Sequence, residues 1–316
     1  MLDGVTVITV TRDVLRAGRE AMLEQCICSV QEQSLRPVEH IVVDGASADG
    51  TAALLETYRR RGWIRLVSEP DRGIYDAMNK GLALAQGRYA AFLNSDDFYH
   101  DRTWLARSVQ ALEASGAACS SAPVLCMDEA GRDRLDLAPR WADMFCAMSV
   151  NHQSLLMSTA VLRRLGGFSL RFPVQADWEL LLRFLLSGGR YAVLADAGCT
   201  YRDFGLSART PRRELLAERM AILEQILRPL GADADVCRSI CDFGHVPAPL
   251  ARRIEERLHP AHRAAFAERN RQTARRKMRR WCWTYSHRPD RAVLRVLGVT
   301  LWDRRFPPSM PEKFQP

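Results

Sequence analysis

Several common features are missing from this sequence of 316 residues, and each absence argues against a class of protein. No apolar run reaches the roughly 18 residues that a transmembrane helix needs. The first residues show no basic and apolar signal-peptide pattern, so we expect a cytoplasmic protein rather than an exported one. Neither a G-x-x-x-x-G-K-[ST] loop nor a G-x-G-x-x-G turn occurs, which argues against a P-loop and against a dinucleotide-binding fingerprint.

The cysteines also lack the spacing of a zinc site or a disulfide framework. There are nine, an odd number, scattered along the chain. Cys26 and Cys28 lie in a helical pattern without a second pair, and Cys237 and Cys241 stand alone one helical turn apart. We therefore interpret them as reduced structural thiols, with metal binding or disulfides as the alternatives.

The net charge of +8 is unevenly distributed. Residues 251–316 hold 17 Lys/Arg and 6 Asp/Glu, whereas the rest of the chain holds 28 and 31. A mildly acidic body is thus followed by a basic tail. Within the tail, the run Arg275–Arg280 precedes Trp281, Trp283 and Tyr285, a combination that suits an anionic membrane surface. Nucleic acid or a solvated helix face would satisfy the same charge.

The first third of the chain alternates between strand and helix patterns. The β-branched and apolar runs predict strands at Val5–Val10, Glu39–Val43, Ile64–Val67 and Tyr89–Leu93. Helical spacing of apolar residues fills the segments between them, at 19–34, 52–61 and 74–86. This alternation predicts a mostly parallel sheet with helices on both faces.

The later segments are more mixed. We expect helices at 102–115, 159–165 and from Gln175 onward, and strands at Cys119–Met127 and Tyr191–Leu194. Residues 128–134 read as a hairpin-like connection and Tyr201–Arg209 as a loop. From Pro211 the spacing predicts helices to about residue 282, including 250–258 and 260–282.

Polar side chains gather where the predicted strands end. Because open α/β sheets bind ligands at the carboxyl ends of their strands, these residues are binding candidates. They are Thr11, Arg12, Asp13, Asp44, Ser47, Asp71, Asn94, Asp96 and Asp97. The neighbours Asp96 and Asp97 repel each other, and a divalent cation would offset that repulsion. The alternative is a solvated acidic pair at a turn.

Three further candidates lie between residues 152 and 178. Asp177 falls in the first turn of the helix after Gln175, where the helix dipole favours a carboxylate, so a simple helix cap is the alternative to a catalytic role. His152 could contact a substrate or serve the core. Trp178 could stack on the face of a ligand or simply pack.

Several stretches together resemble a family-2 glycosyltransferase of the GT-A fold, of the type found in bacterial exopolysaccharide, lipopolysaccharide and glycolipid synthesis. The resemblance covers roughly residues 4–208. It is specific because the motifs agree in order and spacing. They are Val43–Thr51, Glu69–Gly81, Phe92–Asp97, His152-Gln153, Gly166–Phe168 and Ala176–Leu180.

The resemblance implies an organisation for the whole chain. Residues 1–209 would form a GT-A domain, an α/β Rossmann-like and mostly parallel sheet flanked by helices. Its nucleotide-sugar half would be 1–97 and its acceptor half 98–209. Residues 210–316 would form a helical, basic C-terminal extension.

The resemblance also assigns nucleotide-sugar and metal residues. Asp44 matches the acid that recognises the base, with Ser47 in the same motif, and Thr11 and Asp13 lie in the first loop of that site. Asp71 and Asn79 match pocket positions. The segment Asn94-Ser95-Asp96 corresponds to the DXD metal motif, although Asn94 stands where the motif has its first aspartate. Asp96, with Asp97 second, is therefore the predicted ligand of Mn²⁺ or Mg²⁺.

On the acceptor side, Asp177 matches the catalytic base, with Ala176 where the family usually has glutamate. His152, Gln153 and Trp178 belong to the acceptor half, and Ser207 lies in a segment that resembles the active-site loop.

The resemblance therefore implies an inverting glycosyltransferase. It would use a nucleotide-diphospho-sugar, most plausibly a UDP-sugar, and a glycan or lipid-linked acceptor, and it could be peripheral on the inner face of the cell membrane. The alternatives are a sugar nucleotidyltransferase, whose glycine-rich, basic first loop is missing here, and a nucleic-acid-binding protein acting through the tail, although we expect no nucleic acid partner.

Overall fold

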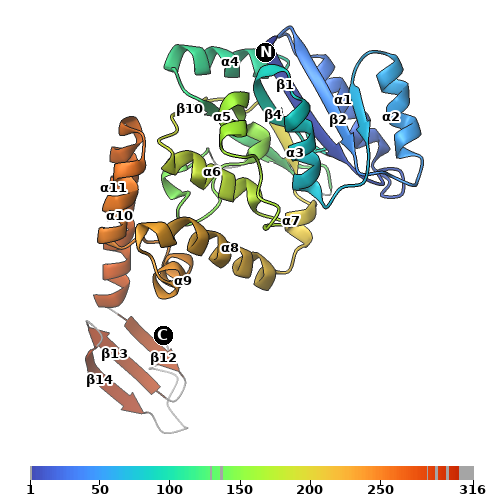
Figure 1. Ribbon diagram of the computed structural model, residues 1–316. Coiled ribbons are helices and arrows are strands. Elements are labelled where there is room, and N and C mark those ends of the chain that lie inside the picture. The colour runs from blue at the N-terminus through green and yellow to red at the C-terminus, as the bar shows by residue number, and fades with distance from the viewer. Residues whose placement is uncertain are drawn as a thin grey trace.

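The computed structural model describes the chain from Leu2 to Arg305, except residues 129, 136–137, 283, 289–290 and 297–298. Side chains are described over residues 4–274, outside 129 and 133–137. Figure 1 shows a sheet flanked by helices, followed by a group of C-terminal helices.

Seven strands form the central sheet. Their bounds are β1 Leu2–Thr11, β2 Val38–Asp44, β3 Arg65–Ser68, β4 Gly87–Phe92, β6 Cys119–Ser121, β9 Leu156–Ser158 and β10 Tyr191–Val193. They lie in the order β10-β6-β9-β4-β1-β2-β3. Strand β9 runs antiparallel to both neighbours, and the other pairs are parallel. The predicted α/β fold with a mostly parallel sheet is thus confirmed.

Helices cover both faces of this sheet because successive side chains of a strand point to opposite sides. The helices are α1 Glu20–Gln31, α2 Thr51–Arg60, α3 Ile74–Leu84, α4 Trp104–Ser115, α5 Thr159–Arg164 and α6 Ala176–Leu186. In β1, Val5 and Val7 pack in the cluster shared with α1 and α4, whereas Ile8 and Val10 pack in the cluster shared with α3 and α6. A third cluster joins α1 to α2.

The expected strand Cys119–Met127 is divided between two sheets. It breaks at Ala122-Pro123, since proline has no N–H for a sheet ladder. A second sheet has the order β5-β11-β7-β8, in strands β5 Phe98–Tyr99, β7 Val124–Met127, β8 Asp133–Leu135 and β11 Cys199–Arg202. Strand β11 and helix α7 Leu206–Arg209 occupy much of the segment expected to be a loop.

The C-terminal helices form as expected. They are α8 Arg212–Leu227, α9 Ala234–Phe243, α10 Ala248–Arg257 and α11 Pro260–Cys282. Buried residues of α8 to α10 join the same core cluster as α3 and α6, so these helices are packed onto the first part of the chain (Figure 1). His262 of α11 also stacks on Tyr191, with ring centroids 3.6 Å apart.

The predicted C-terminal helices are confirmed up to α11, and the described residues beyond it form strands. Strands β12 Thr284–Arg288, β13 Arg291–Val296 and β14 Val299–Arg305 form an antiparallel sheet. The side chains of Arg275–Arg280 and of the aromatic residues after them lie outside the described positions, so the membrane prediction for this run is not tested. No described helix is both long enough and apolar enough to cross a bilayer.

Candidate functional site

A cleft of about 670 Å³ opens at the carboxyl ends of β1 and β4 and extends to the start of α6. Its lining brings together many of the residues singled out from the sequence, although they are far apart along the chain. They are Thr11, Asp71, Asn94, Ser95, Asp96, Asp97, His152, Gln153, Asp177 and Ser207. A cleft of this size and polarity is typical of a small-molecule site.

Asp177 is held in this cleft by donors from three segments. Its Oδ1 accepts hydrogen bonds from the Tyr75 hydroxyl at 3.0 Å and from the backbone N–H of Trp178 at 2.8 Å. Its Oδ2 lies 3.0 Å from Nδ1 of His152. Because Asp177 occupies the first turn of α6, the helix dipole also favours its charge. Asp177 is therefore not the cap of α6, whose N-cap residue is Gln175, and its catalytic role stays a prediction.

His152 links Asp177 to Asn94. Burial lowers the pKa of His152, but the hydrogen bond to Asp177 and the charges of Asp177, Asp97 and Asp96 outweigh burial and raise it above its usual value. In the neutral imidazole, Nδ1–H donates to Asp177, and Nε2 accepts from the Asn94 amide at 3.3 Å. Asn94 Oδ1 is buried without a partner among the described residues, and turning the amide would offer it to a protonated Nε2. Asn94 can thus serve either protonation state.

Asp97 is occupied inside the protein. Its Oδ2 accepts from Gln153 Nε2 at 3.1 Å and its Oδ1 from the Arg202 backbone N–H at 2.9 Å. Burial and the charge of Asp96 raise the pKa of Asp97 to about 7. A carboxylate held in this way ties the turn after β4 to β11, so the structure gives Asp97 a structural task in place of the predicted metal contact.

This shift predicts how stability depends on pH. Between about pH 4 and pH 7 the folded chain keeps the Asp97 proton while the unfolded chain loses it, so the free energy of unfolding should fall as pH rises through that window. A shift of this size corresponds to roughly 4 kcal/mol at most. Asp97→Asn should reduce the drop in melting temperature between pH 5 and pH 8. Glu113→Gln, at an exposed ion pair with Arg88, is the control. Parallel pH curves for wild type and Asp97→Asn would contradict the assignment.

Asp96 faces the cleft but is already paired. Its Oδ2 lies 3.1 Å from NH1 of Arg19. No group of three or more His, Cys, Asp or Glu side chains in the part of the chain with described side chains is arranged to hold a metal. Asn94 offers an amide in contact with His152, and both oxygens of Asp97 are used. One carboxylate paired with a guanidinium does not form an all-protein site for a divalent cation, so most of the oxygen ligands of such a cation would have to come from the phosphates of a bound donor and from water.

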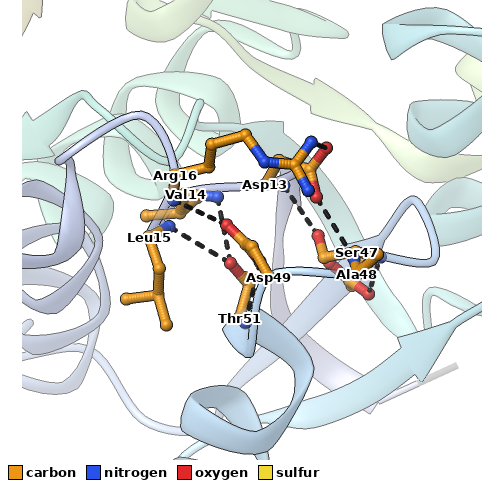
Figure 2. A network of polar contacts seen from close by, with 9 residues as sticks. Asp13, Val14, Leu15, Arg16, Ser47, Ala48, Asp49 and Thr51 are labelled. Atoms are coloured by element: carbon orange, nitrogen blue, oxygen red, sulfur yellow. Dashed lines mark hydrogen bonds and ion pairs between the residues drawn. The ribbon is translucent and has the colours of Figure 1, made fainter.

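Asp44 and Asp13 shape the neighbouring loop and do not line the cleft. Asp44 is fully buried and accepts from the Ser47 N–H at 3.0 Å, the Ser47 hydroxyl at 2.5 Å and the Ser68 hydroxyl at 2.7 Å. The Asp13 N–H donates to Ser47 Oγ at 2.7 Å, and the Ala48 N–H donates to Asp13 (Figure 2). This network fixes the loops after β1 and β2 against each other. Asp13, Asp44 and Ser47 therefore build a loop beside the cleft, and direct contact of these residues with a nucleotide stays a prediction.

Asp71 reaches the cleft from the loop after β3. Its Oδ1 accepts from the Gly73 N–H at 2.8 Å. Its Oδ2 lies where a Cβ on residue 45 would stand only 2.4 Å away, so Gly45 leaves room for this carboxylate. Thr11 Oγ1, also in the lining, is buried without a hydrogen-bond partner within the described set.

Two more of the predicted residues, Asn79 and Trp178, lie outside the cleft lining. The side-chain amide of Asn79 donates to the Phe168 carbonyl and accepts from the Phe168 N–H, at 2.8 Å each. It thereby ties α3 to the turn before α6. Trp178 is fully buried, and its indole N–H donates to the Met144 carbonyl at 2.7 Å. Trp178 therefore packs in the core, as in the second of its two interpretations, because its position on α6 faces inward.

Some residues of the site were missed from the sequence. Tyr75 lies within one of the motifs, but only the fold shows that its hydroxyl reaches Asp177. Arg19 and Arg202 converge on the turn after β4 from distant segments, and Arg202 donates to the Asp96 carbonyl. No spacing in the sequence signals either arginine, since both contacts depend on tertiary packing.

Known proteins share sequence with this chain. Residues 6–158 match the family described as Glycosyl transferase family 2. An uncharacterized glycosyltransferase of Mycobacterium tuberculosis is 34% identical over 192 residues, which cover 58% of this chain and 69% of that protein. A PGL/p-HBAD biosynthesis glycosyltransferase of Mycobacterium bovis is 27% identical over 193 residues, covering 58% of this chain and 73% of the other.

Solved structures share the fold. Residues 1–349 of S. aureus TarS, in complex with UDP-GlcNAc, match with a TM-score of 0.61 at 14% identity, covering 93% of this chain and 97% of that one. A separate match to a longer TarS chain covers 58% of that longer chain. The mannosyltransferase PcManGT from Pyrobaculum calidifontis, in complex with GDP-Man and Mn²⁺, matches with a TM-score of 0.52 at 22% identity over 87% of this chain and 74% of its own. These likenesses support the GT-A fold.

Proposed function

Since the chain belongs to glycosyl transferase family 2, we propose that it moves a sugar from a nucleotide-diphospho-sugar to an acceptor hydroxyl with inversion at the anomeric carbon. The observation that carries this proposal is the Asp177 carboxylate, held in the cleft by Tyr75 and His152. The enzyme is a nucleotide-sugar-dependent glycosyltransferase; its sugar, acceptor and stereochemistry are the proposed part.

The donor lies across the strand ends in this proposal. Thr11 and Asp71 line that part of the cleft, and the Asp71 carboxylate is the polar group offered to the nucleoside. Asp44 and Ser47 support the loop against which the base would rest. TarS was solved with UDP-GlcNAc and PcManGT with GDP-Man, and we place a UDP-sugar first among the donors.

Asp177 acts as the general base. It removes the proton of the acceptor hydroxyl while that oxygen forms a bond to the anomeric carbon and the bond to the diphosphate oxygen breaks on the opposite face. His152 and Tyr75 orient the carboxylate, and a fixed base is effective because its position needs no reorganisation in the transition state. The described side chains form no all-protein site for the predicted Mn²⁺ or Mg²⁺, so this scheme includes no step through a metal.

The acceptor is proposed to be a glycan or lipid-linked molecule in glycolipid or polysaccharide synthesis. The name of the M. bovis relative, a PGL/p-HBAD biosynthesis enzyme, supports this class. A cytoplasmic location at the inner membrane face, with the basic run Arg275–Arg280 on anionic lipid, stays a prediction.

A thermal-shift screen of UDP-, GDP- and dTDP-sugars tests the donor class. A donor at about 100 times its Kd should raise stability by roughly 2.7 kcal/mol, a shift of several degrees. Asp71→Ala, which removes a carboxylate from the nucleoside side of the cleft, should reduce the shift. Any hit is followed by a hydrolysis assay, in which release of nucleoside diphosphate indicates transfer and consumption of pyrophosphate would indicate a nucleotidyltransferase. No stabilisation by any nucleotide sugar, with or without Mn²⁺, would contradict the proposal.

A further inference from the structure

Arg19 stands beside the carboxylate that was predicted to hold a metal. Its guanidinium NH1 lies 3.1 Å from Asp96 Oδ2, and the two side chains are 25% and 12% exposed. The Arg19 guanidinium also lies 5.5 Å from the ring centre of Phe204, just before α7. Salt-bridged on one side and stacked on the other, this cation is fixed at the cleft wall, whose lining includes both Arg19 and Asp96.

The charges of the cleft require a cation when the donor arrives. Asp71, Asp96 and Asp177 all line it, together with Arg12 and with Arg202, whose guanidinium is already bonded to the Asp96 carbonyl and Gln25, and a nucleoside diphosphate adds further negative charge. A guanidinium has five N–H donors in a planar fork, so Arg19 can keep one contact to Asp96 and turn others to phosphate oxygens. A divalent cation on Asp96 would instead have to share the carboxylate with Arg19 through Oδ1, or displace Arg19 from Oδ2.

We propose that Arg19 supplies the positive charge of the donor site: it neutralises Asp96 and binds the donor diphosphate, so nucleotide binding does not require a divalent cation. This inference rests on the proposed function. In this inference the negative charge on the departing diphosphate is neutralised by an arginine of the loop before α1 rather than by a metal on the turn after β4.

Removal of Arg19 should make nucleotide binding dependent on a cation. In Arg19→Gln, Asp96 stays in place without its partner, so it repels the diphosphate unless Mn²⁺ binds there. The probe is UDP, with GDP in parallel, titrated calorimetrically into the full chain in EDTA and in Mn²⁺. Wild type should bind in EDTA, and Arg19→Gln should bind about 10- to 100-fold more weakly, the usual effect of losing a charged hydrogen bond. Mn²⁺ should restore much of that loss in the variant and change wild type little.

Two further variants make the test specific. Arg16→Gln removes an arginine of the same loop whose side chain is 65% exposed and paired with Asp13, so its affinity should match wild type. Arg19→Lys keeps the charge without the fork and should lie between wild type and Arg19→Gln. Melting temperatures of all four proteins establish that they are folded alike.

Two results would overturn the inference. One is wild-type binding that appears only with Mn²⁺, and the other is equal affinity of Arg19→Gln and wild type in EDTA. If wild type binds neither nucleotide with or without Mn²⁺, the proposed function itself fails and the inference fails with it, so the two failures are distinguishable.

Discussion

Asp177→Asn is expected to abolish sugar transfer while leaving the fold and the nucleotide affinity nearly unchanged. The amide has the shape of the carboxylate, and its oxygen can still accept from the Trp178 N–H or from His152. It cannot take a proton from the acceptor, and a positioned general base typically contributes about 10²- to 10⁴-fold. We expect kcat to fall by at least about 100-fold on this basis, measured by release of nucleoside diphosphate.

The matched control is Glu56→Gln, the same carboxylate-to-amide change on α2, where Glu56 pairs with Arg59 outside the cleft lining. It should leave kcat unchanged. UDP affinity is measured calorimetrically on all three proteins. If Asp177→Asn lost nucleotide affinity in proportion to activity, Asp177 would be a binding or structural residue and the base assignment would be wrong.

Trp178→Ala, one residue along, should have the opposite profile. The indole is fully buried in the core, so its loss removes apolar contacts, the hydrogen bond to the Met144 carbonyl and the volume of a large ring. Trp-to-Ala changes in cores typically cost about 3–5 kcal/mol. In a chain of 316 residues that corresponds to a fall in melting temperature of roughly 5–8 °C.

Trp178→Phe separates volume from the hydrogen bond. It keeps most of the apolar contact and should cost less than half as much in urea or thermal unfolding. A Trp178→Ala protein of wild-type stability with a raised KM for acceptor would instead support the sugar-stacking role predicted for Trp178, and would show that the side chain reaches the substrate.

The fold of the first third of the chain could be predicted because it depends on local patterns. Apolar runs such as Ile41–Val43 are long enough to be buried strands, and the helical spacing between them leaves few topologies once parallel connections are required. Prediction was weaker where the partner strand decides. The run Cys119–Met127 has one apolar pattern but belongs to two sheets, and the segment after Cys282 forms strands where a helical tail was expected.

The candidate site was predictable as a set of residues and only partly as a set of roles. Motif spacing identified Asp44, Asp71, Asp96 and Asp177. It did not separate the fully buried Asp44, which holds its own loop, from Asp71, which reaches the cleft. Which oxygen faces solvent depends on neighbours such as Ser68, and those neighbours are set by strand register.

The acidic turn after β4 shows what each level determines. The sequence alone determined that two adjacent carboxylates, Asp96 and Asp97, follow a buried strand at the ligand-binding edge of the sheet, since a short apolar run and its polar end are local properties. Only the tertiary structure decided that Gln153 and the Arg202 backbone occupy Asp97 while Arg19 meets Asp96. Electrostatic interactions act through space between distant segments, so the charge at this turn is set by packing and not by spacing along the chain.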